Sequence, residues 1–279
     1  MAGMADEEGA RYDRIAEGYA QHWAPVIRPA AVRLLDHLAP MLPNGSAHLL
    51  DIGTGTGTLG LAALDRWPGA RVTGIDASSE MAAWARSEAD RRLARVQRPG
   101  FATQVAMAHQ LPFDDATFDV GMSSFVLQLV PDRAAALVEA RRVLRPGAPF
   151  GYVTWLRHRG EPDPPDRVFD ELLDELGFDP PEPGPPASDP ASPRVAAEGL
   201  RRAGFRRVRA WADGLEHRWT PRSYVDFLEH FAEESLFDEL VERERRVLRR
   251  RLLARLRELA PADLRMRLPI VYAIGRAPA

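Results

Sequence analysis

The sequence predicts an α/β protein built around a doubly wound, mostly parallel sheet. The apolar residues Leu49, Leu50 and Ile52 predict a short buried strand, which a glycine-rich turn and a helical pattern from Leu59 to Trp67 follow. Segments typical of strands and helices then alternate along the chain, as they do in βαβ units. A second strand pattern, Arg71 to Asp76, ends in an acid about 20 residues past the turn, where such folds place a carboxylate on a ribose.

The turn after the first strand is suited to a ligand. Gly53, Gly55 and Gly57 occupy every second position, and Asp51 lies at the strand end. Glycine allows unusual φ values and lets a ligand lie against the backbone. The first amides of the following helix favour an anionic group.

A dinucleotide-binding pattern offers another interpretation of this turn. The spacing Gly-x-Gly-x-x-Gly is present from Gly55 to Gly60. Counted from Gly53, the first glycine after the strand, the pattern fails because Thr58 stands where glycine is needed. A nicotinamide oxidoreductase therefore remains an alternative that uses the second register.

Composition limits the function classes. The chain has 279 residues, 45% of them hydrophobic, which is enough for one buried core or for a core plus a smaller lobe. Its net charge of −3 does not attract nucleic acid. It has no cysteine, which excludes disulfides and thiol chemistry. No apolar run reaches the roughly 18 residues of a membrane span. We expect a cytoplasmic monomer or homodimer without metal, nucleic acid or membrane.

The N-terminal segment predicts a helix that lies over a ligand. Tyr12, Ile15, Tyr19 and Trp23 share one helical face. The alternative is that this face only packs on the core. Residues 1–9 are expected to fray.

The last third of the chain predicts helices followed by a strand. Two helical runs are expected, Tyr224 to Phe231 and Ser235 to Leu259, the second with an apolar stripe that includes Val241. The Arg-rich face of the second run also carries Glu at helical spacing, which favours a solvated surface over nucleic-acid binding. Leu268 to Gly275 predicts the final strand, and Pro180 to Pro193 a loop.

Several of these segments together resemble a known family. The pattern acid-x-Gly-x-Gly-x-Gly from Asp51 is similar to motif I of class I S-adenosylmethionine (SAM)-dependent methyltransferases, in particular the small-molecule, UbiE-like type. Further segments occur in the family's order. They are Tyr12-Asp-x-x-Ala-x-x-Tyr19, Leu111-Pro-Phe113, Phe118-Asp-Val120, Leu144-x-Pro-Gly147 and Leu200-x-x-Ala-Gly-Phe-x-x-Val208.

The resemblance implies a Rossmann-like, seven-stranded sheet of order 3-2-1-4-5-7-6 with an antiparallel last strand and a helical lid. It implies a single catalytic domain, 1–279. Its expected parts are a lid (10–40), a SAM-binding core (46–157), a Pro-rich cover (158–194), sheet completion (195–211 and 266–277) and a helical insertion over the substrate pocket (212–265).

The resemblance also implies a set of cofactor-binding residues, for SAM and its product S-adenosylhomocysteine. Asp76 is expected to hold the ribose diol, and Tyr19 to close over the ligand. Met107 replaces the acid that receives the adenine amino group in the family, so adenine recognition is expected to be weak. The expected cofactor-binding residues are Tyr19, Asp51, Gly53, Thr54, Gly55, Asp76, Ala77, Met81, Met107, Ala108, His109 and Ser123.

The implied reaction is methyl transfer to an oxygen, nitrogen or carbon nucleophile of a small molecule, driven mainly by positioning. The expected substrate-binding residues are Trp23, Phe125, Gln128 and Trp155. His22 and His158 are the candidate bases, because a neutral imidazole suits proton transfer near neutral pH. The alternatives are a SAM-binding protein with another chemistry or a regulatory role, and an RNA methyltransferase.

Overall fold

The computed structural model describes residues 2–42, 46–158, 160–178 and 189–279, with the side chains of residues 2–8 left aside. These residues form one seven-stranded sheet of order β3-β2-β1-β4-β5-β7-β6, which confirms the predicted topology. All neighbouring strands are parallel except those that pair with β7. The strands are β1 (His48–Ile52), β2 (Arg71–Asp76), β3 (Phe101–Val105), β4 (Val120–Ser124), β5 (Pro149–Trp155), β6 (Arg206–Arg218) and β7 (Arg265–Arg276).

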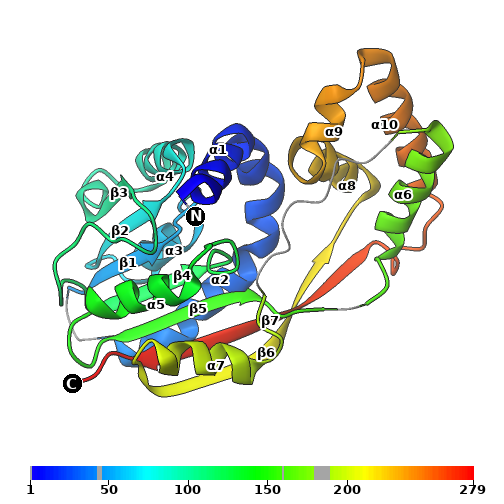
Figure 1. The fold of residues 1–279 in the computed structure, drawn as a ribbon. Coiled ribbons are helices and arrows are strands. Elements are labelled where there is room, and N and C mark those ends of the chain that lie inside the picture. Colours follow the sequence, from blue (N-terminus) through cyan, green and yellow to red (C-terminus); the bar gives the residue numbers. More distant parts are fainter. Residues whose placement is uncertain (1, 43–45, 159, 179–188) are drawn as a thin grey trace.

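Helices cover both faces of the sheet (Figure 1). One buried cluster joins one face to α2 (Ala24–Leu38), α3 (Thr58–Arg66) and α4 (Ser79–Arg92). A second cluster joins the opposite face to α5 (Arg133–Arg142) and α7 (Pro193–Arg202). No helix in the part of the chain that the structure describes is long and apolar enough to cross a bilayer.

The sheet order reverses between β1 and β4. The chain moves outward from β1 through β2 to β3, and then returns to β4 on the other side of β1. In open parallel sheets, a crevice forms at such a switch point, outside the carboxyl ends of the strands. The ends of β1, β2, β4 and β5 therefore define where a ligand is expected.

The N-terminal helix is longer than the sequence indicates. α1 spans Ala2–Gly18, so residues 2–9 are helical and the expectation that they fray is wrong for the backbone. A π-helical turn, η1 (Tyr19–Trp23), leads without interruption into α2. α2 begins at Ala24 and contains Pro29 within it.

A two-stranded arm carries the helical insertion away from the rest of the sheet (Figure 1). β6 and β7 stay paired from Ala210↔Ala273 out to Arg218↔Arg265, so residues 212–218 are strand rather than helix. Beyond them lie α8 (Pro221–Phe227), the π-helical turn η4 (Leu228–Ala232), α9 (Glu234–Glu239) and α10 (Glu242–Leu256). The predicted single run from Ser235 is broken at Val241, which is 62% exposed and precedes α10.

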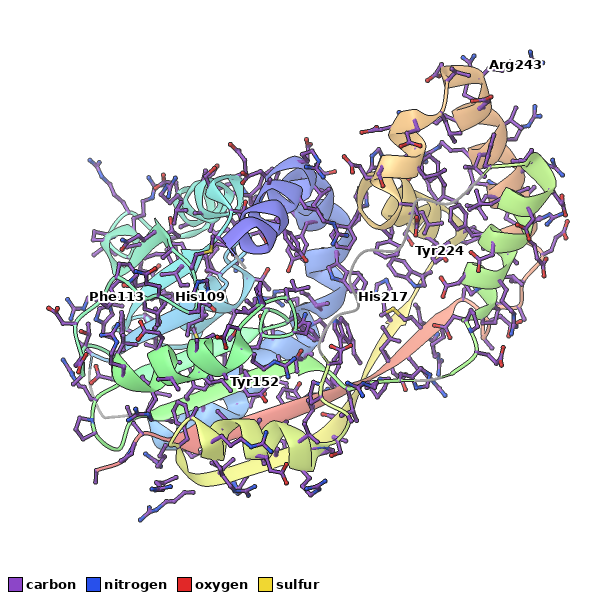
Figure 2. The ribbon with its side chains drawn as sticks, in the orientation of Figure 1. His109, Phe113, Tyr152, His217, Tyr224 and Arg243 are labelled. Atoms are coloured by element: carbon purple, nitrogen blue, oxygen red, sulfur yellow. The ribbon has the colours of Figure 1, made fainter. Side chains whose placement is uncertain are left out.

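The insertion also includes α6 (Pro164–Leu176), which the sequence placed in the Pro-rich cover. Tyr224 of α8, labelled in Figure 2, donates a hydrogen bond to Asp166 of α6. Glu175 of α6 pairs with Arg251 and Arg255 of α10. The expected loop from Pro180 to Pro193 lies mostly outside the described residues.

Asp51 anchors the glycine turn from below. Its side chain is fully buried at the end of β1, and its Oδ2 accepts a hydrogen bond from Thr54 Oγ1 at 2.9 Å. The backbone of Gly60 donates a second hydrogen bond. No protein group that the structure describes donates to Oδ1. Burial raises the pKa of Asp51 to about 7, although the two hydrogen bonds oppose the shift.

This pKa predicts a pH dependence of stability. The folded state of Asp51 takes up a proton below about pH 7 and the unfolded state only near pH 4, so its contribution to stability is lost as the pH rises through 7. Asp51→Asn cannot ionise. Its free energy of unfolding relative to wild type should therefore improve between about pH 5 and pH 8, by roughly 2–3 kcal/mol.

Urea unfolding at several pH values measures this difference. Asp114→Asn, at an exposed acid, serves as the control and should show no such change. A difference between Asp51→Asn and wild type that is constant over this pH range would refute the assignment.

Candidate active site

The three glycines of the turn adopt the left-handed conformation that the sequence suggested. Gly53, Gly55 and Gly57 have φ of 70°, 52° and 84°. A Cβ on Gly53 would overlap the side chain of Val126, whereas a Cβ on Gly55 would meet no atom closer than the Tyr19 side chain, in van der Waals contact at 3.8 Å. The backbone at Gly55 is therefore the part of the turn that a ligand can approach.

Asp76, at the end of β2, joins this turn to the start of α4. Its Oδ2 accepts from the backbone N–H of Gly55 at 2.8 Å, and its Oδ1 accepts from that of Ser78 at 3.0 Å. Burial raises the pKa of Asp76, while these hydrogen bonds from the backbone lower it. A carboxylate oxygen has two lone pairs, so each oxygen keeps the capacity to accept a further hydrogen bond.

The N-terminal helix is tied to the same point. Ser78 caps α4 by accepting from the N–H of Met81, and its hydroxyl donates to Asp13 Oδ1 of α1 at 2.5 Å. The N–H of Glu80 donates to the same oxygen at 3.0 Å. These bonds lower the pKa of Asp13, the one from Ser78 most strongly. They hold α1 across the end of β2.

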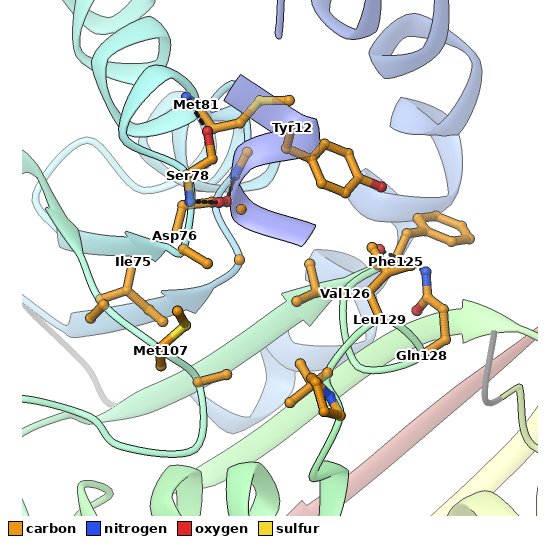
Figure 3. A pocket seen from close by; sticks show the side chains of 18 of the residues that line it. Tyr12, Ile75, Asp76, Ser78, Met81, Met107, Phe125, Val126, Gln128 and Leu129 are labelled. Carbon is orange, nitrogen blue, oxygen red and sulfur yellow. Dashed lines mark hydrogen bonds between the residues drawn. The ribbon is translucent and has the colours of Figure 1, made fainter. Parts of the chain in front are cut away.

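A cavity of about 220 Å³ lies between these elements (Figure 3). It runs from the loop after β3, past the glycine turn, to the ends of β4 and β5. Its lining residues are Gly9, Tyr12, Tyr19, Trp23, Gly53, Gly55, Ile75, Asp76, Ala77, Ser78, Met81, Ala106, Met107, Ala108, His109, Phe125, Val126, Gln128, Leu129, Val130, Pro131 and Trp155.

One end of the cavity is aromatic. Trp155 lies at the end of β5, with ring centroids 4.3 Å from Phe125 and 5.9 Å from Trp23. Phe125 follows β4 with a φ of 55°, which is unusual for a residue with a side chain and common at functional sites. Gln128 is 5% exposed; its Nε2 donates to the Phe125 carbonyl at 2.8 Å, and its Oε1 accepts from Thr154 at 2.6 Å.

The cavity brings together most of the residues that the sequence singled out. Among those expected to bind the cofactor, the wall contains Tyr19, Gly53, Gly55, Asp76, Ala77, Met81, Met107, Ala108 and His109. All of the expected substrate-binding residues line it as well, namely Trp23, Phe125, Gln128 and Trp155. Their roles stay predictions, because lining a cavity does not establish binding.

Three expected cofactor residues lie behind the wall. Asp51 lies under the turn. The Thr54 hydroxyl donates to Asp51, and the Thr54 backbone N–H donates to the Ile75 carbonyl at 2.8 Å. Ser123 is fully buried and donates to the Ile52 carbonyl at 2.8 Å, which joins β4 to β1. The structure thus places these side chains where they shape the site without reaching the cavity.

Neither candidate base lines the cavity. His22 faces away from it and stacks on His230 of the insertion, with ring centroids 5.3 Å apart. Burial lowers the pKa of His22, and His230 adds to this effect. His158 is exposed beyond the end of β5.

Some lining residues were not among the expected site residues. Tyr12 was placed on the helical face of Tyr19 but was given no role in binding, and Ser78 follows Asp76 at the strand end. Gly9 was assigned to a frayed segment; in the structure, a Cβ on it would lie 3.3 Å from the Ala77 carbonyl, so α1 packs closely there. Val126 and Leu129 carried no signal, because they belong to the irregular segment between β4 and α5.

One group of three side chains in the described residues has metal-ligand spacing: Asp226, Glu229 and His230. The guanidinium of Arg249 already contacts both carboxylates, with 2.9 Å to Asp226. A bound cation would compete with Arg249, so this group gives no argument for a metal centre.

Comparisons with known proteins agree with this geometry. Residues 50–150 match the family described as "Methyltransferase domain". Over 114 residues, 41% of the chain, the sequence is 43% identical to the ubiquinone/menaquinone biosynthesis C-methyltransferase UbiE of Paracoccus denitrificans, of which the match covers 43%. The chain spans between 28% and 59% of the length of several curated relatives that it matches.

Solved structures share the fold at low sequence identity. The [4+2]-cyclase SpnF superposes with a TM-score of 0.58 at 19% identity, over 99% of this chain and 97% of that one. A phosphoethanolamine N-methyltransferase of Haemonchus contortus, solved with S-adenosylhomocysteine, gives 0.55 at 18% identity, over 98% of this chain and 58% of that one. Residues 50–150 therefore match a family of methyltransferase domains, and the sheet that contains them has the strand order of the Rossmann-like methyltransferase fold.

Proposed function

We propose that this protein transfers a methyl group from SAM to a nucleophilic oxygen, nitrogen or carbon of a small molecule. One observation carries the proposal. A single cavity joins the Gly55 backbone and the Asp76 carboxylate to the aromatic end formed by Trp23, Phe125 and Trp155. A donor bound at the first end and an acceptor at the second would meet inside that cavity.

The residues present fit the cofactor. The space between Gly55 and the Tyr19 side chain is a cradle that any Cβ on Gly55 would begin to fill, and Asp76 offers two carboxylate oxygens for a ribose diol. Met107 and Ala108 lie at the β3 end, where the adenine is expected to pack. When bound, SAM supplies an electrophilic methyl group on a positively charged sulfur.

The aromatic end suits an apolar or aromatic acceptor. Ring faces attract a cation at close range, so Trp155 and Phe125 would also stabilise the sulfonium. The buried amide of Gln128 is fixed by Thr154 and by the Phe125 carbonyl, which makes it a rigid polar group for orienting an acceptor. Holding two reactants in line is worth roughly 7–11 kcal/mol, so positioning alone is a sufficient mechanism.

The identity of the acceptor rests on chemistry and on one relative's name. The relative in Paracoccus denitrificans is named as a C-methyltransferase of ubiquinone and menaquinone biosynthesis, which makes electron-rich phenols and hydroquinones the first acceptors to test. The cyclase among the fold neighbours shows that this fold also serves other chemistry. A SAM-binding role without methyl transfer is therefore the second candidate.

The first prediction concerns the glycine turn. Gly55→Ala places a methyl group in the cofactor cradle and should weaken S-adenosylhomocysteine binding at least tenfold in calorimetry. Gly147→Ala is the matched control, because Gly147 also has a positive φ, 76°, but lies in open space away from the cavity. Equal affinities for both variants and wild type would show that the cradle is not the cofactor site.

The second prediction concerns Asp76. Asp76→Ala should cost about 1.5–3 kcal/mol of affinity for S-adenosylhomocysteine, the usual contribution of hydrogen bonds to a charged group. For wild type, an analogue that lacks both ribose hydroxyls should bind correspondingly less tightly than S-adenosylhomocysteine. For Asp76→Ala, the analogue and S-adenosylhomocysteine should bind equally tightly. If the analogue loses as much affinity for the variant as for wild type, Asp76 does not hold the diol.

The third prediction concerns the transfer itself. Purified protein with SAM should methylate at least one member of a panel of phenols, hydroquinones, amines and carboxylic acids. His22→Ala and His158→Ala should keep most of this activity, because neither side chain lines the cavity. Trp155→Ala should raise the KM of the acceptor more than that of SAM.

Product formation followed by mass spectrometry decides between the candidates. Cofactor binding with no methyl transfer to the panel would favour the second candidate. If either His variant lost activity, and its pH-rate profile also lost a titration near pH 6–7 that wild type shows, that histidine would be the general base.

A further inference from the structure

The helical insertion reaches the cavity wall from behind. Its π-helical turn η4 packs directly against η1, the π-helical turn that carries the wall residues Tyr19 and Trp23. π-helical turns change the direction of side chains within a helix and are frequent at functional sites. Here, two of them meet at one interface, one from the N-terminal segment and one from the insertion.

The backbones of the two segments touch at Gly18. This glycine has φ of −59° and ψ of −42°, an ordinary helical conformation that any residue adopts. A Cβ on it would overlap the backbone carbonyl of His230 in η4. Glycine is unfavourable within a helix, so the close approach of the insertion, rather than the local conformation, explains its presence.

Phe231 then sets the rings of the wall. Its ring lies edge-on to Tyr19, with centroids 5.6 Å apart, and almost parallel to Trp23 at 5.7 Å and 17°. Phe227 stacks on Trp23 from the same side at 5.2 Å. Neither phenylalanine lines the cavity. They contact the wall residues on the side that faces the insertion.

We propose that Gly18 and Phe231 are positioning residues through which the helical insertion fixes Tyr19 and Trp23 over the cavity. Tyr19 lies above Gly55, where the cofactor is expected, and Trp23 lies beside Trp155, where the acceptor is expected. The insertion thus determines the shape of the binding cavity without contributing its side chains to the wall. The consequence for ligands rests on the proposed function, but the positioning itself does not.

Hydrogen exchange of the unliganded protein tests the positioning. Gly18→Ala and Phe231→Leu should raise the exchange rates of amides in residues 12–23 by about tenfold or more, because local opening governs exchange. Two matched controls separate this from general destabilisation. Gly199→Ala adds a methyl group to another helical glycine that has room for it, and Phe237→Leu shortens a buried ring of the insertion away from η1.

A double-mutant cycle tests the effect on the cofactor. Phe231→Leu should weaken S-adenosylhomocysteine binding about threefold or more, and should have no further effect when Tyr19 is already replaced by alanine, because residues that act through one contact are not additive. The Phe231 variant keeps the test valid if Gly18→Ala fails to fold.

Each outcome is decisive. Unchanged exchange in residues 12–23 of both variants, or the same increase in the controls, would overturn the proposal. An equal loss of affinity in the wild-type and Tyr19→Ala backgrounds would overturn the route through Tyr19. Wild-type protein that does not bind S-adenosylhomocysteine would refute the proposed function alone, because the exchange comparison still decides the positioning.

Discussion

The hydrogen bond from the Gly55 backbone to the Asp76 carboxylate is the contact on which the site depends. It joins the turn after β1 to the end of β2, and the second oxygen of the same carboxylate holds the start of α4 through Ser78. The Ser78 hydroxyl in turn donates a hydrogen bond to Asp13 of α1. One side chain therefore sets the positions of the glycine turn, a helix start and the N-terminal helix. A partly buried carboxylate is tolerated there because a backbone N–H group donates to each of its oxygens.

The fold followed from the sequence because its signals were local and repeated. Each βαβ unit was indicated by a local pattern, such as the glycine turn or the acid at the end of β2. Few sheet topologies are compatible with βαβ units in a given order. The strand β2 was predicted with its observed ends, Arg71 and Asp76. The insertion was less predictable. Residues 212–218 are mostly polar, and Leu215 is the one buried side chain among them, so their strand alternation was missed.

The sequence predicted which residues line the cavity where they lie at or just after a strand end, as Asp76, Met107 and Trp155 do. It was not predicted where contacts between distant segments decide the outcome. His22 falls within a motif that covers the cavity, yet the π-helical register of η1 turns its ring toward His230. Ser123 has a polar side chain at a strand end, as a ligand contact would, but its hydroxyl donates a hydrogen bond to the Ile52 carbonyl. Such pairings depend on tertiary packing, which spacing in the sequence does not encode.

The arm has a consequence for how molecules enter and leave. β6 and β7 are paired without interruption from Ala210↔Ala273 to Arg218↔Arg265, and β7 also pairs with β5 up to Trp155. Swinging the insertion outward would require bending a continuous ladder that includes the strand carrying Trp155. The N-terminal segment has no such ladder and is attached at the turn by the side chain of Asp13. A ligand that leaves past the insertion would therefore have to disturb backbone pairing, whereas one that leaves past α1 would disturb only packing, such as that of Gly18 on η4, and the side-chain hydrogen bonds of Asp13 at α4.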